Sequence, residues 1–163
     1  HDVKLIDGPD GLFLAMPSEI ETSTLAIKAW SQCKNIVVPR TDWVTHKMEP
    51  IQITSLETDL ASNNFGLREP TQGIAVPLGC LDMVVIPGLA FDHHGFRVGR
   101  GRGFYDRFLS QQDFKGTRCA LCFHEQLLDV PLPCEPHDIP MNFIVTDKEI
   151  IHCPANHARI PTH

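Results

Sequence analysis

Arginine and glycine alternate in one short stretch of the chain, and an aspartate follows. The stretch holds Arg97, Gly99, Arg100, Gly101, Arg102 and Gly103, with Asp106 three residues further on. Glycine permits positive φ and a close approach of the backbone to a ligand, and successive amides of such a loop can form a concave anion site. Arginine adds a permanent charge whose donors suit phosphate, and a carboxylate beside phosphate oxygens suits Mg²⁺. The pattern therefore indicates a polyphosphate site with a metal ion.

The residues on either side predict the elements that position this loop. The apolar run from Met83 to Ile86 is followed by Pro87-Gly88, which predicts a short buried strand that ends in a turn. After the loop, apolar residues recur with helical spacing at Phe104, Tyr105, Phe108 and Leu109. The order is strand, turn, loop and helix, and the dipole of the helix would strengthen an anion site at its start.

The stretch by itself leaves other interpretations open. Glycine-rich loops also form plain turns, and Arg-Gly repeats bind RNA in disordered tails. The stretch is not a Walker A loop, because no Gly-Lys-Ser/Thr follows, and it is not a GxGxxG dinucleotide fingerprint. On chemistry alone, phosphate binding and a plain turn are about equally supported.

A longer pattern is more specific. The run from Pro87 to Asp92, then Gly95, then the run from Arg97 to Asp106 closely resembles the signature of the 5-formyltetrahydrofolate cyclo-ligase family, also called methenyltetrahydrofolate synthetases. The resemblance implies an enzyme that uses ATP and Mg²⁺ to close 5-formyltetrahydrofolate into 5,10-methenyltetrahydrofolate, with release of ADP and phosphate. It implies Arg100 and Tyr105 as catalytic residues and Asp106 and Asp138 as magnesium ligands. The implied ATP contacts are Arg97, Gly99, Arg100, Gly101, Arg102, Gly103, Phe104 and Tyr105.

Weaker matches to the same family lie along most of the chain. The implied substrate contacts are Leu14, Glu19, Met48 and Tyr105. Structural roles stay open beside these: Glu19 can be a solvated carboxylate near a helix start, Met48 can be simple packing, and Tyr105 can be a core residue.

Three further polar positions keep two interpretations each. Arg40 ends a predicted strand, where it is either at a ligand-binding sheet edge or simply on the surface. Glu69 lies in a segment that matches the family and is either structural or a ligand contact. Asn142 stands where many relatives carry an acidic residue, so this part of the match is weaker.

Composition and charge restrict the class of protein. The chain has 163 residues, 42% hydrophobic and 21% charged, which is ordinary for one globular domain with a sizeable core. A net charge of -6 argues against general nucleic-acid binding, so the arginine stretch is a local basic island. No apolar run reaches the length of a membrane span and no signal peptide is visible, so we expect a cytoplasmic protein without an evident obligatory protein partner.

The six cysteines are scattered along the chain, so we expect reduced structural thiols rather than a disulfide framework. Cys119 and Cys122 lie in a predicted strand, whose successive residues face opposite sides, and no second such pair accompanies them. A zinc site is therefore not expected.

Short apolar strands alternate with helical stretches, which predicts one α/β domain over residues 1–163 with a mostly parallel sheet. The predicted strands begin near Leu12, Asn35, Met83, Thr117 and Phe143, and a helix is expected to run to about Gln32. The family resemblance implies a single-domain Rossmann-like open sandwich, in which helices flank the central sheet.

Members of the family begin with a helical segment whose basic residues contact the ATP phosphates. The chain starts where that segment would already have ended, and its early Lys4 does not match the pattern, so we expect the segment to be missing here. A chain without that segment could be a catalytically weak relative that binds nucleotide or folate, and the Arg-Gly loop leaves a second alternative, an RNA-binding module. The acidic net charge and the few aromatic residues near the Arg-Gly loop argue against RNA binding.

Overall fold

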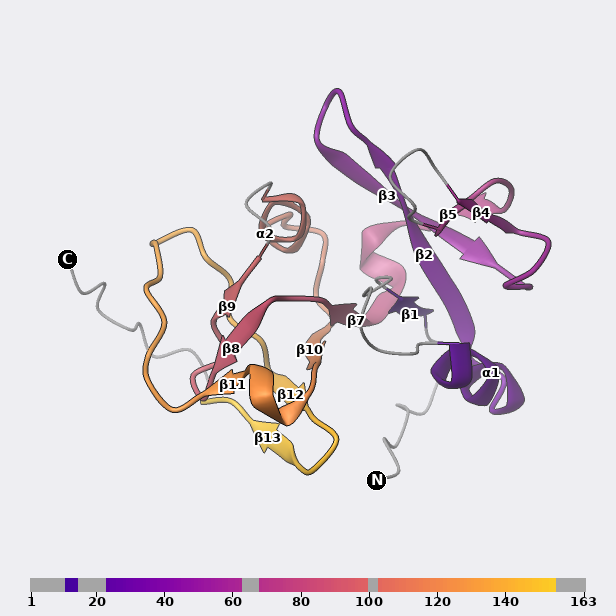
Figure 1. Cartoon of the computed structure of the whole chain (residues 1–163). Helices are drawn as coiled ribbons and strands as arrows, with labels where there is room; N and C mark the ends of the chain where they lie inside the picture. Colours follow the sequence, from indigo (N-terminus) through magenta and orange to yellow (C-terminus); the bar gives the residue numbers. More distant parts are fainter. Residues whose placement is uncertain (1–10, 15–22, 63–67, 100–102, 155–163) are drawn as a thin grey trace.

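The computed structural model describes residues 11–14, 23–62, 68–99 and 103–154. In these residues the chain forms an eight-stranded mixed sheet, a three-stranded sheet, a two-stranded sheet and two α-helices (Figure 1). The order of strands across the large sheet is β13-β12-β10-β7-β1-β2-β3-β6.

The five central strands of the large sheet run parallel to one another. They are β12 (Phe143–Val145), β10 (Thr117–Leu121), β7 (Leu81–Ile86), β1 (Gly11–Leu14) and β2 (Asn35–Asp42). Antiparallel strands complete both edges: β13 (Ile150–His152) beside β12, and β3 (Lys47–Ile53) followed by β6 (Ile74–Ala75) beside β2. Four of the seven pairings are thus parallel and three are antiparallel.

The central strands contain a topological switch point between β1 and β7. From β1 the chain passes through α1 (Ser23–Ser31) to β2 on one side, and from β7 it continues to β10 and β12 on the other. In open α/β sheets, ligands collect outside the carboxyl ends of the strands at such a point. Here Leu14 ends β1 and pairs with Val85 of β7, one residue before Ile86 leads into the turn at Pro87-Gly88.

Smaller elements complete the fold around the large sheet. The three-stranded sheet consists of β11 (Leu127–Leu128), β8 (Ala90–Asp92) and β9 (Arg97–Val98), and α2 (Phe104–Leu109) follows it. The two-stranded sheet pairs β4 (Leu60–Ser62) with β5 (Arg68–Pro70). Two 3₁₀ turns, η1 (Leu78–Cys80) and η2 (His124–Gln126), precede β7 and β11.

Two apolar clusters form the core, one on each face of the large sheet. Val84 and Ile86 belong to one cluster together with Phe108 of α2, whereas Val85 belongs to the other together with Ala26 of α1. Successive residues of a strand face opposite sides, so α1 and α2 cover opposite faces. Because β7 is buried on both faces, its sequence is a continuous apolar run from Met83 to Ile86.

The structure confirms the α/β class and all five predicted strands. The helix expected to end near Gln32 is α1, and the helix expected after the loop is α2. The sheet is mixed, because a tight turn at 43–46 joins β2 to β3, and such a turn forces antiparallel pairing. In the described part of the chain, no helix is long and apolar enough to cross a bilayer.

Candidate functional site

The turn that follows β7 is tightly constrained. Leu89 N donates to Val98 O at 2.7 Å, which joins the turn to β9. A Cβ atom on Gly88 would lie 2.7 Å from the ring of Phe91, which is fully buried. Only glycine fits there without displacing the ring, so Gly88 lets the backbone pass directly over the core.

The Arg97 side chain lies behind this turn and is almost completely buried, with 7% exposure. Its Nη1 donates to Pro87 O at 3.2 Å, and its Nη2 lies 3.5 Å from Asp106 Oδ2. The guanidinium carbon is 5.5 Å from the centroid of the Tyr105 ring, a cation–π distance. Arg97 therefore connects the turn after β7 to the first turn of α2, on the far side of the loop.

One donor of the guanidinium is left over. Arg97 Nε is buried and has no hydrogen-bond partner among the described residues. An unmet buried donor costs about 1–3 kcal/mol, more for a charged group. The Gly99 backbone passes so close that a Cβ there would lie 2.8 Å from Arg97 Nη1. The loop thus begins in direct contact with the guanidinium.

The start of α2 combines a glycine, an aromatic contact and an acid. Gly103 precedes the helix with φ 68°, a left-handed conformation that favours glycine. The Phe104 ring lies 5.3 Å from Trp43 and 5.4 Å from His46, both in the turn between β2 and β3. Asp106 lies in the first turn of the helix. The β2–β3 turn therefore packs beside the end of the candidate phosphate loop.

Tyr105 is partly buried against the core cluster that also contains the buried Met48. Burial raises the pKa of the Tyr105 phenol well above its ordinary value, and the nearby Arg97 charge opposes this only in part. The phenol therefore keeps its proton at physiological pH. As a catalytic candidate it can donate a hydrogen bond but does not act as a base.

The other predicted residues are only partly placed by the structure. Arg100, Gly101, Arg102 and Glu19 lie outside the described residues, as do residues 1–10 with Lys4. The backbone of Leu14 lies at the switch point, beside β7. Arg40 is exposed and pairs with Glu49 across the β2–β3 hairpin at 2.6 Å.

The second predicted magnesium ligand, Asp138, lies in the segment between β11 and β12. Its Oδ2 accepts a hydrogen bond from Glu135 N at 2.7 Å, and its Oδ1 is 3.7 Å from His137 Nε2. Within the described ranges, no group of three or more His, Cys, Asp or Glu side chains is arranged to hold a metal ion. The pairing of Asp106 with Asp138 stays a prediction.

Two of the undecided residues make structural contacts. Glu69 Oε1 accepts a hydrogen bond from Thr41 N at 3.3 Å, which ties β5 to the end of β2. Asn142 Oδ1 accepts one from Arg118 N at 2.8 Å, where β10 and β12 begin to pair. An amide at Asn142 thus has an anchoring role of its own.

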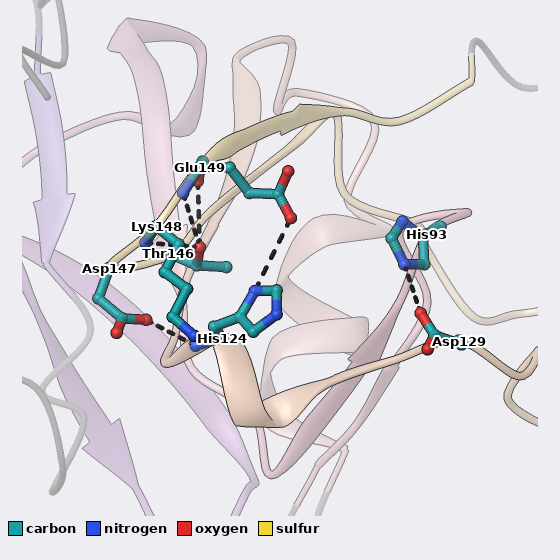
Figure 2. A network of polar contacts seen from close by, with 7 residues as sticks. All are labelled: His93, His124, Asp129, Thr146, Asp147, Lys148 and Glu149. Carbon is teal, nitrogen blue, oxygen red and sulfur yellow. Dashed lines mark hydrogen bonds and ion pairs between the residues drawn. The ribbon is translucent and has the colours of Figure 1, made fainter.

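A polar network that the sequence did not suggest joins the carboxyl ends of β10 and β12 (Figure 2). His124 N donates to Asp147 Oδ1 at 2.7 Å, which lowers the pKa of the Asp147 carboxyl. His124 Nδ1 lies 3.7 Å from Glu149 Oε1, and Thr146 Oγ1 accepts from Glu149 N at 3.0 Å. No sequence motif predicts these contacts, because they depend on which strands become neighbours.

All six cysteines are free thiols. Burial raises the pKa of Cys119 to about 12 and those of Cys122 and Cys153 to about 11. Thiols with such values are poor nucleophiles and poor metal ligands at neutral pH. The expectation of structural thiols is thus supported for these three.

Comparison of the chain with known proteins identifies a family and several relatives. A model of the 5-formyltetrahydrofolate cyclo-ligase family matches residues 11–147. The 5-formyltetrahydrofolate cyclo-ligase of Mus musculus is 31% identical over 144 residues, which cover 82% of this chain and 70% of the mouse protein. The protein of the same name from Escherichia coli K12 is 30% identical over 145 residues, 85% of this chain and 78% of its own.

A solved structure resembles the fold as well. The 5,10-methenyltetrahydrofolate synthetase of Aquifex aeolicus superposes with a TM-score of 0.72 at 26% identity, over 94% of this chain and 75% of that one. The sequence relatives and the structural neighbour therefore indicate the same family.

Proposed function

The chain belongs to the 5-formyltetrahydrofolate cyclo-ligase family, a family of enzymes, and on that premise we propose that it converts 5-formyltetrahydrofolate and ATP into 5,10-methenyltetrahydrofolate, ADP and phosphate with the help of Mg²⁺. The observation that supports this most is the family match over residues 11–147, which includes the whole candidate site from the turn after β7 to α2. The proposal includes a Rossmann-like open sandwich, which the five parallel central strands and the two helices on opposite faces support.

Under this proposal, the ATP phosphates lie against the loop between β9 and α2. The donors would be Arg97, Arg100 and Arg102, together with backbone amides of Gly99, Gly101, Gly103, Phe104 and Tyr105. The unmet Arg97 Nε supports this placement, because a phosphate oxygen would satisfy a buried charged donor at little cost.

Asp106 and Asp138 would hold Mg²⁺. Carboxylate oxygens suit this hard cation, which keeps water and phosphate oxygens in its remaining positions. When bound, the ion would neutralise charge on the phosphates. The neighbouring Arg97 holds Asp106 at the end of the loop, which suits a ligand position.

The proposed chemistry needs positioning more than a protein nucleophile. The formyl oxygen attacks the γ-phosphorus of ATP and ADP leaves. N10 of the folate then attacks the activated formyl carbon and loses its proton, and that carbon loses its oxygen as phosphate. Arg100 would stabilise the negative charge that develops during transfer, and Tyr105, which keeps its proton, would donate a hydrogen bond.

The folate would lie at the switch point, against Leu14, Glu19, Met48 and Tyr105. Two observations support this placement. Leu14 ends β1 beside β7, at the edge where ligands of open α/β sheets collect. Met48 belongs to the same core cluster against which Tyr105 packs, although Met48 itself is buried.

The purified chain tests the proposal directly. We expect the absorbance of 5,10-methenyltetrahydrofolate to appear when 5-formyltetrahydrofolate, ATP and Mg²⁺ are all present, and to be absent without ATP or with a chelator. Arg100→Ala should abolish the signal and weaken ATP binding, while the exposed Arg40→Ala serves as a matched control. Ligand-induced thermal stabilisation without product would instead identify a nucleotide or folate binder and contradict the proposed activity.

A further inference from the structure

The turn after β7 presents three successive carbonyl groups, and side chains from two other segments satisfy them. Pro87 O accepts a hydrogen bond from Arg97 Nη1 at 3.2 Å. Gly88 O and Leu89 O both accept from Gln126 Nε2, at 3.1 and 3.3 Å. Arg97 and Gln126 therefore hold the same turn, although 29 positions separate them in the chain.

Gln126 is itself held in place. Its Oε1 accepts a hydrogen bond from Phe123 N at 2.8 Å, within the η2 turn that follows β10. The next residue, Leu127, begins β11 and pairs with Phe91 of β8. The side-chain amide thus uses its acceptor on one segment and its donors on another, so it links the carboxyl ends of β7 and β10. A carboxylate or a hydrocarbon chain at this position could not do both.

We propose that Gln126 is a positioning residue for nucleotide binding. It fixes the turn at Pro87–Leu89, the turn fixes the Arg97 guanidinium through Pro87 O, and the guanidinium fixes Asp106 and the start of the loop at Gly99. This inference rests on the proposed function, because the loop is assigned to ATP there. Gln126 does not touch the reacting atoms and acts only through Arg97.

When Gln126 is lost, the remaining contacts of the turn favour a shift of the turn over its unfolding. Leu89 N still donates to Val98 O at 2.7 Å, which keeps the turn attached to β9. Gly88 already lies against the Phe91 ring, so the turn has no room to move toward the core. Without the Gln126 amide, the turn is free to move outward, away from the core. Pro87 O, the acceptor for Arg97 Nη1, would move with it, so the guanidinium would lose its fixed position.

The test compares Gln126→Met with Gln52→Met, using the whole chain. Gln52 is also partly buried and donates through Nε2 to Asn35 Oδ1 at 3.1 Å, but it lies on β3. Gln126→Met removes both hydrogen bonds to the turn, and we expect part of their energy to be lost from nucleotide binding, as a rise of roughly three- to tenfold in the Kd and KM for MgATP. We expect both values to stay within twofold of wild type with Gln52→Met, although both variants lower the melting temperature.

Gln126→Glu supplies a readout that a purely structural role would not change. At neutral pH its carboxylate faces two carbonyls and donates nothing, so the Kd for MgATP should rise as much as with Gln126→Met. Towards pH 5 the protonated acid regains one O–H donor, so the Kd relative to wild type should recover for Gln126→Glu alone. This variant keeps the shape of the side chain and decides the question if Gln126→Met does not fold.

Unchanged MgATP affinity in both Gln126 variants, with only a lower melting temperature as in Gln52→Met, would overturn the inference. The failure of the proposed function looks different. A wild-type chain that binds ATP without turnover contradicts the activity, and the Kd values still decide the role of Gln126. A wild-type chain that does not bind MgATP contradicts both.

Discussion

Two loops of this protein are each built around one buried charged side chain, Asp59 in one and Arg97 in the other. The Asp59 carboxylate lies between β3 and β4 and accepts hydrogen bonds on both oxygens. Its donors are Thr54 N, Thr54 Oγ1, Ser55 N, Thr58 Oγ1 and Gln72 Nε2. These donors are all neutral groups, and they lower the pKa of Asp59 to about 2.

The Arg97 loop has the opposite character. The partners of Arg97 include a second ionisable group, Asp106, and an aromatic face, Tyr105, and its Nε has no partner in the described residues. A closed network such as that of Asp59 can only stabilise the fold. A network with an unmet charged donor beside a glycine loop can still bind an anion, and this difference separates a structural loop from a candidate site.

The largest expected effect is that of Arg97→Met. It leaves Asp106, which is 27% exposed, without its partner, so we expect unfolding to become easier by about 2–3 kcal/mol and ATP binding to be lost. Denaturant titration and ATP titration measure the two effects.

The double variant Arg97→Met with Asp106→Leu separates them, since replacing both members of a buried pair by apolar residues is often nearly neutral for stability. We expect stability to recover while ATP binding stays lost. If ATP still binds to Arg97→Met, the network around Arg97 with its unmet donor has no role in the site.

The second prediction concerns the closed network. Asp59→Asn removes an acceptor from the cluster of donors, so we expect lower stability but an unchanged KM for ATP. Because the folded pKa of about 2 lies below the ordinary aspartate value of 3.8, Asp59 stabilises the fold above pH 4, and this contribution disappears as the pH falls from about 4 to about 2. Denaturation midpoints at pH 5 and pH 2.5 should differ less in Asp59→Asn than in wild type.

The third prediction uses the cysteines to follow the end of β10, which leads into the η2 turn that contains Gln126. Cys33 and Cys80 are exposed, whereas burial raises the pKa of Cys122 to about 11. At pH 8 we expect iodoacetamide to modify the exposed pair at least tenfold faster than Cys122, as measured by mass spectrometry. Gln126→Met should accelerate labelling of Cys122 relative to Gln52→Met, and equal rates in the two variants would argue against loosening of this segment.

The smallest effect is expected for an ion pair that lies in neither network. Arg40 and Glu49 are each about half exposed, and their bond of 2.6 Å crosses the β2–β3 hairpin. Surface pairs contribute about 0–1 kcal/mol because water screens them. Arg40→Met should therefore leave stability within 1 kcal/mol of wild type in denaturant titration. If Arg40→Met lost as much stability as Arg97→Met, burial would not explain the difference between these two arginines.

The sequence predicted the helices and strands of the fold well, because each depends on a local pattern of apolar residues. The apolar run from Met83 to Ile86 became β7, and the helical spacing from Phe104 to Leu109 became α2. It missed the mixed character of the sheet, since the pairing direction of β2 and β3 follows from a turn at 43–46 whose residues carry no strong turn signal.

For the candidate site, the sequence by itself determined which chemistry is present: arginines, glycines and an acid in one order, and a resemblance specific enough to predict the family that the relatives confirm. Only the tertiary structure decided how those residues meet. It buried Arg97 against Pro87 and Asp106, and it placed Gln126 across the turn. Residue types and spacing lie along the chain, but burial and hydrogen bonding between distant segments depend on which strands become neighbours, and no local pattern encodes that.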